Sequence, residues 1–446
     1  MRRMSFIAAV AATALVLAAC GDGDGAPESG ETGLNGAGKT LNVLVQANTI
    51  YPDQQRSWFT EINDKFKAQT GAEVKFETFA SPNDELTKIQ TSVLSGQGPD
   101  IYSLGTTFTP TAYATGAFLE LKDDDWKKLG GKDAFLPATL GISGPDAEHQ
   151  VGIPFTSRPF VMAYNTDLLK AAGIDKPADS WDGLLEQAKK LTSGGTYGLA
   201  VAYADGFDPW KFIWAMSVQA GNPLVKEKKA SLTDPSTLKA YQTYLGWLAT
   251  DKVVNPAAVG WKNAQAIADF GAGKAAFLPM VSATSKVTLD KSAVAGKYAY
   301  AIMPTIPPGQ TSKPSGGVGA TSILSGDNLV VAKYTKNKDL ALALVKLLTS
   351  AEQQESYYKT FGEMPTNAAA AKKLQADPAL APIIDSASKA SGTPFNGAWS
   401  QVQLALVNVV VQSIPALKDG KLDEAKLKQL IADGQKAAQD ALDKSK

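Results

Sequence analysis

The stretch Leu41-Asn42-Val43-Leu44-Val45-Gln46 is an apolar run of strand length, and it opens the part of the sequence that decides the fold. Apolar residues then recur at helical spacing from Trp58 to Phe66, and Thr70-Gly71 ends that helix. Residues 73–77 alternate between polar and apolar side chains, which predicts a second strand. The folded part therefore begins with a strand, a helix and a strand.

The same alternation continues up to residue 104. Ser81-Pro82 opens a second helix, and residues 101–104 form a third apolar strand. Strands that alternate with helices predict a mostly parallel sheet with right-handed crossovers. Ligands of such sheets bind beyond the carboxyl ends of the strands. We therefore expect a binding site at residues 46–49, 79–84 and 104–108, which are polar and hold no phosphate-binding glycine motif.

The composition excludes several classes of protein. The chain has 446 residues, with 44 Lys and Arg against 44 Asp and Glu, so it has no basic excess that would favour a nucleic-acid partner. One His and one Cys cannot form a structural zinc site or an intramolecular disulfide, and we expect no metal and no cofactor. A length of 446 residues with 44% apolar residues is typical of a globular protein of two or three folding units.

The first forty residues predict export and a membrane anchor. Arg2 and Arg3 precede an apolar run over residues 6–19, which is too short to span a bilayer and is typical of a secretory signal over residues 1–19. Leu17-Ala18-Ala19-Cys20 resembles the bacterial lipoprotein cleavage box, which makes Cys20 the predicted lipid attachment point. The alternative is an ordinary signal peptide with an incidental thiol. Residues 20–40 are rich in glycine and predict a flexible linker to the outer face of the cell membrane.

The middle of the chain carries a series of short motifs in a fixed order. The longest part of the series begins at Val151-Gly152-Ile153-Pro154-Phe155, continues through residues 160–169 and ends at Ser180-Trp181-Asp182. Other motifs lie at residues 94–100, 270–277 and 361–366. This series is similar to the family 1 extracellular solute-binding proteins of ABC importers, the group of maltose- and other oligosaccharide-binding proteins. The likeness extends from Cys20 to the end of the chain.

The resemblance implies an α/β fold of the type II periplasmic-binding-protein class, in which two α/β lobes are joined by a hinge and enclose a ligand cleft. We place lobe one at residues 41–153 plus 302–362 and lobe two at residues 154–301 plus 363–446. The apolar spacing near the end of the chain, between Leu422 and Ile431, predicts a final helix.

Aromatic and hydroxyl-binding side chains at the cleft favour a sugar ligand, because sugars stack on rings and present hydroxyl groups to planar polar side chains. Trp399 matches the family position of a tryptophan that stacks on the sugar; the alternative is a core tryptophan. Trp210 and Trp214 lie four residues apart on one predicted helix face, and we favour Trp210 for the cleft. Arg158 is expected either to bind the ligand or to form a salt bridge at the hinge.

The full set of predicted ligand contacts combines these residues with strand-end positions and motif positions implied by the resemblance. It comprises Gln46, Asn48, Asp84, Thr106, Thr107, Arg158, Trp210, Trp214, Met280, Gly316, Gly317, Glu363 and Trp399.

The expected function is that of a monomeric, lipid-anchored substrate-binding protein that captures a sugar or oligosaccharide and delivers it to the transmembrane subunits of an ABC permease. It is not expected to be an enzyme. One alternative keeps the fold and changes the ligand to a polyamine, a sugar acid or a metal complex. The other is a secreted glycosidase that uses two carboxylates, although no motif identifies such a pair.

Overall fold

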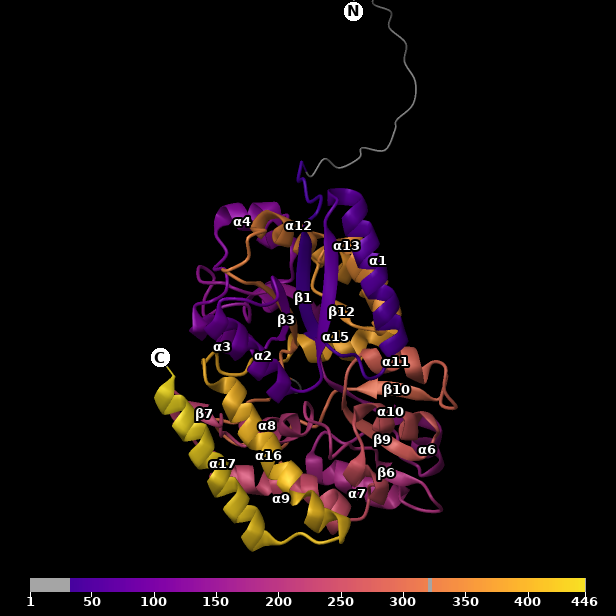
Figure 1. Cartoon of the computed structure of the whole chain (residues 1–446). Helices are drawn as coiled ribbons and strands as arrows, with labels where there is room; N and C mark the ends of the chain where they lie inside the picture. Colours follow the sequence, from indigo (N-terminus) through magenta and orange to yellow (C-terminus); the bar gives the residue numbers. More distant parts are fainter. Residues whose placement is uncertain (1–32, 320–322, 446) are drawn as a thin grey trace, which may run out of the picture. The chain divides into compact units, whose positions relative to one another are not determined.

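A computed structural model of the chain describes residues 33–319 and 323–445. These residues form two large β-sheets and a two-stranded ribbon, together with the helices that pack on them. The six-stranded sheet has the order β12-β4-β11-β3-β1-β2. Its strands are β1 (Thr40–Gln46), β2 (Glu73–Phe79), β3 (Ile101–Gly105), β4 (Ile153–Ser157), β11 (Gly326–Val331) and β12 (Met364–Pro365). Figure 1 shows this sheet with the helices that cover it. The predicted signal peptide, Cys20 and most of the predicted linker lie outside the described residues.

The first three strands and the helices between them confirm the predicted alternation. β1 pairs in parallel with both β2 and β3. The connecting helices are α1 (Pro52–Thr70) and α2 (Pro82–Ser95). Gly71 ends α1 in the left-handed conformation with φ of 78°, and the Ser81 side chain caps α2 by accepting the Asp84 N–H.

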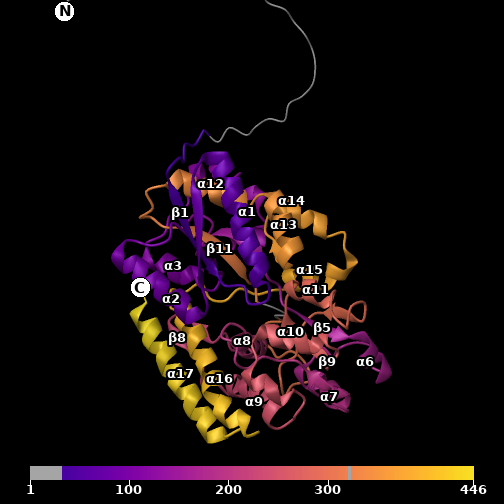
Figure 2. The same cartoon turned by 45° about the vertical axis from the view of Figure 1, so that its right-hand side comes forward.

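Further helices pack around the six-stranded sheet (Figure 2). They are α3 (Thr109–Thr115), α4 (Asp123–Lys128), η1 (Lys132–Ala134), α5 (Pro137–Leu140), α12 (Lys338–Leu348), α13 (Ala351–Phe361) and α14 (Ala368–Leu374). The apolar side chains of Trp58, Ile62 and Phe66 on α1 are buried together with residues of α12 and α13. The helical spacing seen in the sequence therefore marks the face of α1 that is in the core.

The four-stranded sheet has the order β10-β5-β9-β6 and forms the second α/β lobe. Its strands are β5 (Val161–Asn165), β6 (Tyr197–Leu199), β9 (Ala275–Val281) and β10 (Tyr298–Ala301), and the ribbon is β7 (Val225–Lys226) with β8 (Lys229–Ala230). The remaining helices are α6 (Thr166–Ala171), α7 (Trp181–Leu191), α8 (Pro209–Gln219), α9 (Pro235–Ala249), η2 (Pro256–Gly260), α10 (Asn263–Gly271), α11 (Thr284–Leu289), η3 (Pro378–Leu380), α15 (Ala381–Ser388), α16 (Trp399–Lys418) and α17 (Glu424–Lys444).

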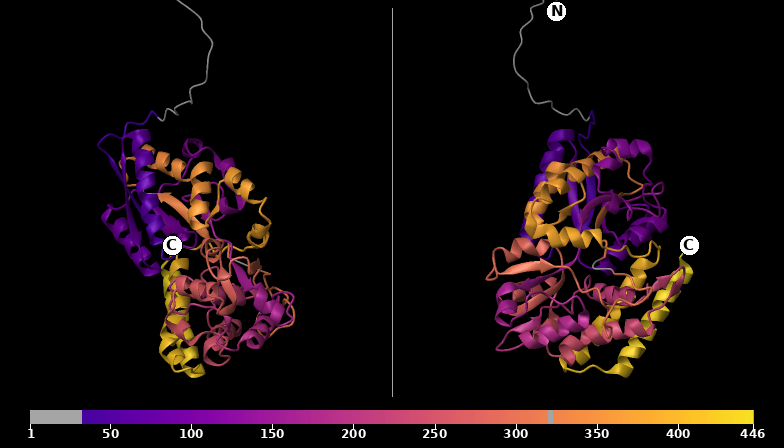
Figure 3. Two further views of the ribbon diagram at one scale, coloured as in Figure 1. Left: turned by 90° about the vertical axis from the view of Figure 1, so that its right-hand side faces the viewer. Right: turned by 180° about the vertical axis from the view of Figure 1, so that it is seen from behind.

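The last two helices lie side by side in both views of Figure 3 and pack extensively against each other. α17 confirms the predicted final helix, and Leu427, Leu430 and Ile431 bury its apolar face. Within the described residues, α16 alone is long and apolar enough to cross a membrane, but most of this helix is buried inside the protein. This burial is typical of a core helix.

The lobe limits stay a prediction, but the six-stranded sheet continues past two of them. β4 extends to Ser157 in pairing with β11, and β12 at Met364–Pro365 pairs with β4. The prediction had assigned residues 154–157 and 363–365 to lobe two. The backbone groups of these strands find their partners within the first sheet, a fact that the sequence pattern of a short apolar run does not reveal.

Candidate functional site

A cavity of about 380 Å³ is lined by residues of the six-stranded sheet and its loops and by loop and helix residues of the second lobe, and its volume falls within the range of small-molecule sites. Residues 46–49, 80–81 and 105–108, which follow β1, β2 and β3, form one wall. Residues 204–208 and the start of α8 contribute from the other lobe. The structure thus brings together the three strand ends that the parallel-sheet topology singled out.

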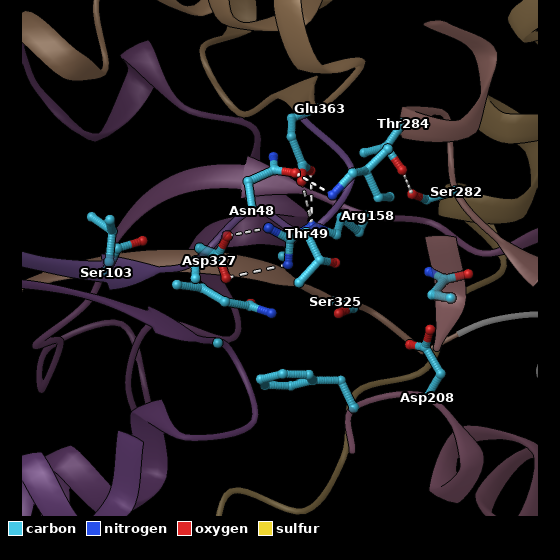
Figure 4. A pocket seen from close by; sticks show the side chains of 18 of the residues that line it. Asn48, Thr49, Ser103, Arg158, Asp208, Ser282, Thr284, Ser325, Asp327 and Glu363 are labelled. Atoms are coloured by element: carbon cyan, nitrogen blue, oxygen red, sulfur yellow. Dashed lines mark hydrogen bonds and ion pairs between the residues drawn. The ribbon is translucent and has the colours of Figure 1, made fainter. Parts of the chain in front are cut away.

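Three charged side chains form a cluster in the cavity wall, which we call the arginine cluster: Arg158, Asp327 and Glu363. The Arg158 Nε lies 2.6 and 2.9 Å from the two carboxylate oxygens of Glu363. Its Nη1 lies 3.3 Å from Asp327 Oδ1, and its Nη2 donates to Asp327 Oδ2. Figure 4 shows the guanidinium held between the two carboxylates. Arg158 therefore forms the salt bridge that was one of its two expected roles.

The local backbone explains how Asp327 reaches this position. The pairing of β11 with β4 shifts register between Asp327 and Asn328, so a bulge lies beside the cavity. Gly326 has a φ of 152°, and a Cβ at this position would lie 1.9 Å from the carbonyl oxygen of Thr156. The Thr156 hydroxyl lies 3.2 Å from Asp327 Oδ2 and accepts the Asp327 N–H. The close approach at Gly326 and this bond hold the Asp327 carboxylate toward Arg158.

Burial raises the pKa values of Glu363 and Glu85, two of the acidic groups in the cavity wall. Burial raises the pKa of Glu363, Arg158 lowers it and the charge of Asp327 raises it, with a net increase. Burial also raises the pKa of Glu85 well above its ordinary value, and the charge of Asp327 adds to that effect. For Arg158, burial lowers the pKa of the guanidinium, but Asp327 and Glu363 outweigh it and raise that pKa overall.

Several uncharged polar groups face the same cavity. The hydroxyls of Ser282 and Thr284 lie 2.9 Å apart, and Figure 4 shows them across from Asn48. Thr106 Oγ1 and Gln403 Oε1 are buried and have no hydrogen-bond partner among the described residues. Buried polar atoms are normally paired, so these two positions are candidates for ligand contacts.

All three tryptophans predicted for the cleft are buried in the core of the second lobe, and one of them also lines the cavity. That residue is Trp210, as favoured, which is 2% exposed, whereas Trp214 is not among the lining residues. Trp399 is fully buried and packs edge-to-face on Trp210, with ring centroids 6.1 Å apart. The structure therefore places Trp399 behind Trp210 and not on the cavity wall.

Other predicted residues also lie outside the cavity lining. Asp84 accepts the Ala80 N–H and belongs to the cap of α2. Met280 is buried in β9 with a positive φ of 57°. Gly317 packs against the end of α8, where a Cβ would lie 2.2 Å from the carbonyl oxygen of Gln219, and the neighbouring Gly316 is exposed. The predicted residues that the structure does bring to the cavity are Gln46, Asn48, Thr106, Thr107, Arg158, Trp210 and Glu363.

The prediction missed four notable lining residues: Glu85, Phe207, Asp327 and Gln403. Phe207 lies three residues before Trp210, which was already predicted for the cleft, and its ring is only half-buried. An aromatic residue so close to Trp210 was therefore a usable signal. Glu85 follows the predicted Asp84 at the start of α2. Asp327 and Gln403 carry no sequence signal, because a bulge and a helix contact place them.

Neither a metal site nor a histidine contributes to the cavity in the described part of the chain. No group of three or more His, Cys, Asp or Glu side chains there is arranged to hold a metal ion. His149 is exposed, lies 2.9 Å from Asp146 and is not among the lining residues.

Comparisons with known proteins agree with the geometry. Residues 61–382 match the family described as bacterial extracellular solute-binding protein. The diacetylchitobiose-binding protein DasA of Streptomyces coelicolor is 27% identical over 414 residues, which cover 90% of this chain and 91% of DasA. Two solved structures show the same fold. A tagatose-bound solute-binding protein of an ABC transporter from Thermotoga lettingae has a TM-score of 0.73 at 20% identity, and covers 91% of this chain and 100% of its own. Maltose-bound MalE3 of T. maritima has a TM-score of 0.72 at 21% identity, with 89% and 99% covered.

Proposed function

The chain belongs to the bacterial extracellular solute-binding proteins, and from this membership we propose that it captures a neutral sugar or oligosaccharide in the cavity between its two sheets. The observation that carries the proposal is the lining of that cavity. Amide and hydroxyl side chains from the ends of β1 and β3 face the aromatic residues Phe207 and Trp210 of the second lobe. Sugars require this combination, since their C–H faces pack on rings while their hydroxyls need hydrogen-bond partners.

The relatives support the same ligand class. DasA is a diacetylchitobiose-binding protein, and the two solved structures hold tagatose and maltose. The ligand of this chain is proposed from its own lining residues together with these likenesses.

In the proposed cycle, the sugar binds between the lobes, and contacts from both lobes favour the closed arrangement. A ligand shifts such an equilibrium only by its differential affinity for the two arrangements. The closed protein then delivers the sugar, chemically unchanged, to the transmembrane subunits of an ABC permease. The protein acts outside the cytoplasm as a monomer, held to the outer face of the cell membrane by a lipid on Cys20.

The glycosidase alternative is weakened by the role of the carboxylates in the cavity. Arg158 engages Asp327 and Glu363, and Lys211 engages Asp208, so none of these three is free to act as a nucleophile or to accept a proton from water without breaking an ion pair. Asp205 accepts three backbone N–H groups, which leaves Glu85 without a second free carboxylate in the lining. A polyamine would need several ionised carboxylates with no cationic partner, whereas Asp327 and Glu363 pair with Arg158, and Asp208 pairs with Lys211.

A thermal-shift screen tests the proposed function. The purified protein is melted with mono- to tetrasaccharides, polyamines and sugar acids, and the best ligand is analysed by mass spectrometry after hours of incubation. We expect a neutral sugar to raise the melting temperature further as its concentration increases, with about 2.7 kcal/mol of added stability at one hundred times Kd, and to be recovered intact. Stabilisation by polyamines alone, or the progressive appearance of shorter sugars, would contradict the proposal.

The lipid anchor has its own test. Cys20→Ser removes the sulfur that would carry the lipid, and the folded lobes begin only at Thr40. We expect the variant to leave the membrane fraction, or to keep its signal peptide, while the purified lobes melt at the wild-type temperature. A wild-type chain found entirely in the soluble extracellular fraction with an unmodified thiol would exclude the anchor.

A further inference from the structure

We infer that the cavity discriminates against anionic ligands, so that it accepts a neutral sugar and rejects the corresponding sugar acid or sugar phosphate. This inference rests on the proposed function and narrows its substrate class. It follows from the inventory of charges in the lining and from what each cation and each backbone donor already binds.

Carboxyl groups outnumber cations in the described cavity lining. The acidic residues are Glu85, Asp205, Asp208, Asp327 and Glu363, and the basic residues are Arg158, Lys211 and Lys262. Glu85 is not counted as a charge, because burial raises its pKa well above the ordinary value, and the remaining four carboxyl groups exceed the three cations by one. An anionic ligand therefore finds no net positive charge in the lining, and like charges brought together in a desolvated site cost several kcal/mol, which suppresses the wrong partner.

Arg158 is the cation that an anionic ligand would need most, since a guanidinium binds carboxylate or phosphate in a forked geometry. That geometry is already used within the protein. The Nε binds Glu363, and both terminal nitrogens bind Asp327. A ligand carboxylate would have to displace one of two buried carboxylates, each of which would then lose its partner.

Lys211 is likewise occupied. Its ammonium pairs with Asp208 and lies over the ring of Phe160, 4.2 Å from the centroid. Both members of the ion pair have little exposed side chain, 12% and 14%. Lys262, in contrast, is exposed, where a single ammonium is hydrated and screened by salt.

Three backbone donors near the cavity are also taken. The start of α10 would ordinarily attract an anion, because a helix N-terminus offers unpaired N–H groups. Here Asp205 Oδ2 accepts the Asn263 N–H at 3.1 Å, and Asp205 Oδ1 accepts the N–H groups of Phe207 and Asp208 at 2.7 and 3.1 Å. A side chain of the protein therefore occupies the place of an anionic ligand.

The test compares matched ligands that differ only in charge. The best neutral sugar from the screen, the uronic acid of the same sugar and its phosphate ester are titrated into the wild-type protein by calorimetry. We expect the two anions to bind at least about 30-fold more weakly than the neutral sugar. Glu363→Gln keeps the shape of the side chain and leaves Arg158 with one carboxylate. The ratio of the Kd of each anion to the Kd of the neutral sugar should therefore fall by about tenfold. Glu148→Gln, an exposed change of equal charge outside the lining, should leave the ratio unchanged.

The outcomes separate this inference from the proposed function. If the Kd values of the neutral sugar and its anions differ by less than about threefold, the inferred discrimination against anions is wrong, whereas the proposed sugar binding stands. If no sugar of any charge binds, the proposed function fails. Should Glu363→Gln fail to fold, Asp208→Asn provides the second variant, since it removes the partner of Lys211 and should also narrow the ratio. An unchanged ratio in a folded variant would overturn the inference.

Discussion

Replacement of Trp399 by alanine distinguishes a core residue from a ligand platform. The ring is fully buried and packs edge-to-face on Trp210, which does line the cavity. Truncation of a buried tryptophan costs about 3–5 kcal/mol, of which an aromatic pair supplies about 0.5–1.5 kcal/mol. Its indole N–H has no partner among the described residues, so no hydrogen bond is lost.

The expected signature is a loss of stability with little loss of affinity. At roughly 2.1 cal/mol/K per residue, a fold of about 410 residues has an unfolding entropy of about 0.9 kcal/mol/K, so Tm should fall by about 3–6 °C. Calorimetric titration with the best sugar should show Kd raised by less than about fivefold, through relaxation of Trp210 alone.

A core tryptophan away from the cavity provides the matched control. Trp247→Ala deletes a side chain that is 1% exposed and outside the lining, and it should lower Tm by a similar amount with unchanged affinity. If Trp399→Ala does not fold, Trp399→Phe takes its place as the test variant. The reasoning is refuted if Trp399→Ala weakens binding by about tenfold or more while Tm stays within about 1 °C of the wild type.

Three further substitutions test the cavity and its supports. Phe207→Ala removes the half-buried ring and should weaken sugar binding by about tenfold at nearly constant Tm, as calorimetry and melting will show. Gly326→Ala should destabilise the protein by about 1–3 kcal/mol in urea unfolding, because its Cβ would lie 1.9 Å from the Thr156 carbonyl oxygen. Glu85→Gln should raise Tm at pH 8, and the gain should shrink toward pH 4. Burial raises the pKa of Glu85 in the folded chain, so the stability that comes from its protonated form is full below about pH 4.3 and is lost as pH rises.

Each of these predictions has a control and a contradicting result. Phe207→Leu should retain part of the affinity for the sugar. If Phe207→Ala binds the sugar as tightly as the wild type, the Phe207 ring is not part of the binding site. Gly260→Ala, where a Cβ meets nothing within 4 Å, should be neutral, and equal behaviour of the two glycine variants would refute the close approach at Gly326. A constant difference in Tm between wild type and Glu85→Gln from pH 4 to pH 8 would show that Glu85 is not buried with a raised pKa.

The sequence predicted the parts of the site that depend on local pattern. The alternation of strands and helices up to Leu104 places residues 46–49 and 105–108 at one sheet edge, and the structure has them in one cavity. The spacing of Trp210 and Trp214 on one predicted helix face gave two candidates, and the favoured residue, Trp210, lines the cavity.

The parts that depend on long-range packing could not be predicted in the same way. Arg158 was expected either to bind the ligand or to form a salt bridge at the hinge, and Glu363 was expected to contact the ligand. The structure pairs the two with each other in the cavity wall, and the third member of the cluster, Asp327, comes from a strand more than 160 residues after Arg158. The burial of Trp399 likewise depends on the contact between α16 and α8, since the same local sequence suits a ring on either side of the helix. Sequence spacing alone does not decide between these two sides.

The central claim is tested most directly by a crystal structure of the protein in complex with the neutral sugar that stabilises it most in the thermal-shift screen. We predict that the sugar lies in the cavity, with one ring face against Phe207 or Trp210 and hydroxyls within hydrogen-bond distance of Asn48 or Thr106, while Arg158 remains paired with Asp327 and Glu363. A sugar bound elsewhere on the molecule, or bound in the cavity through an Arg158 released from both carboxylates, would contradict this account.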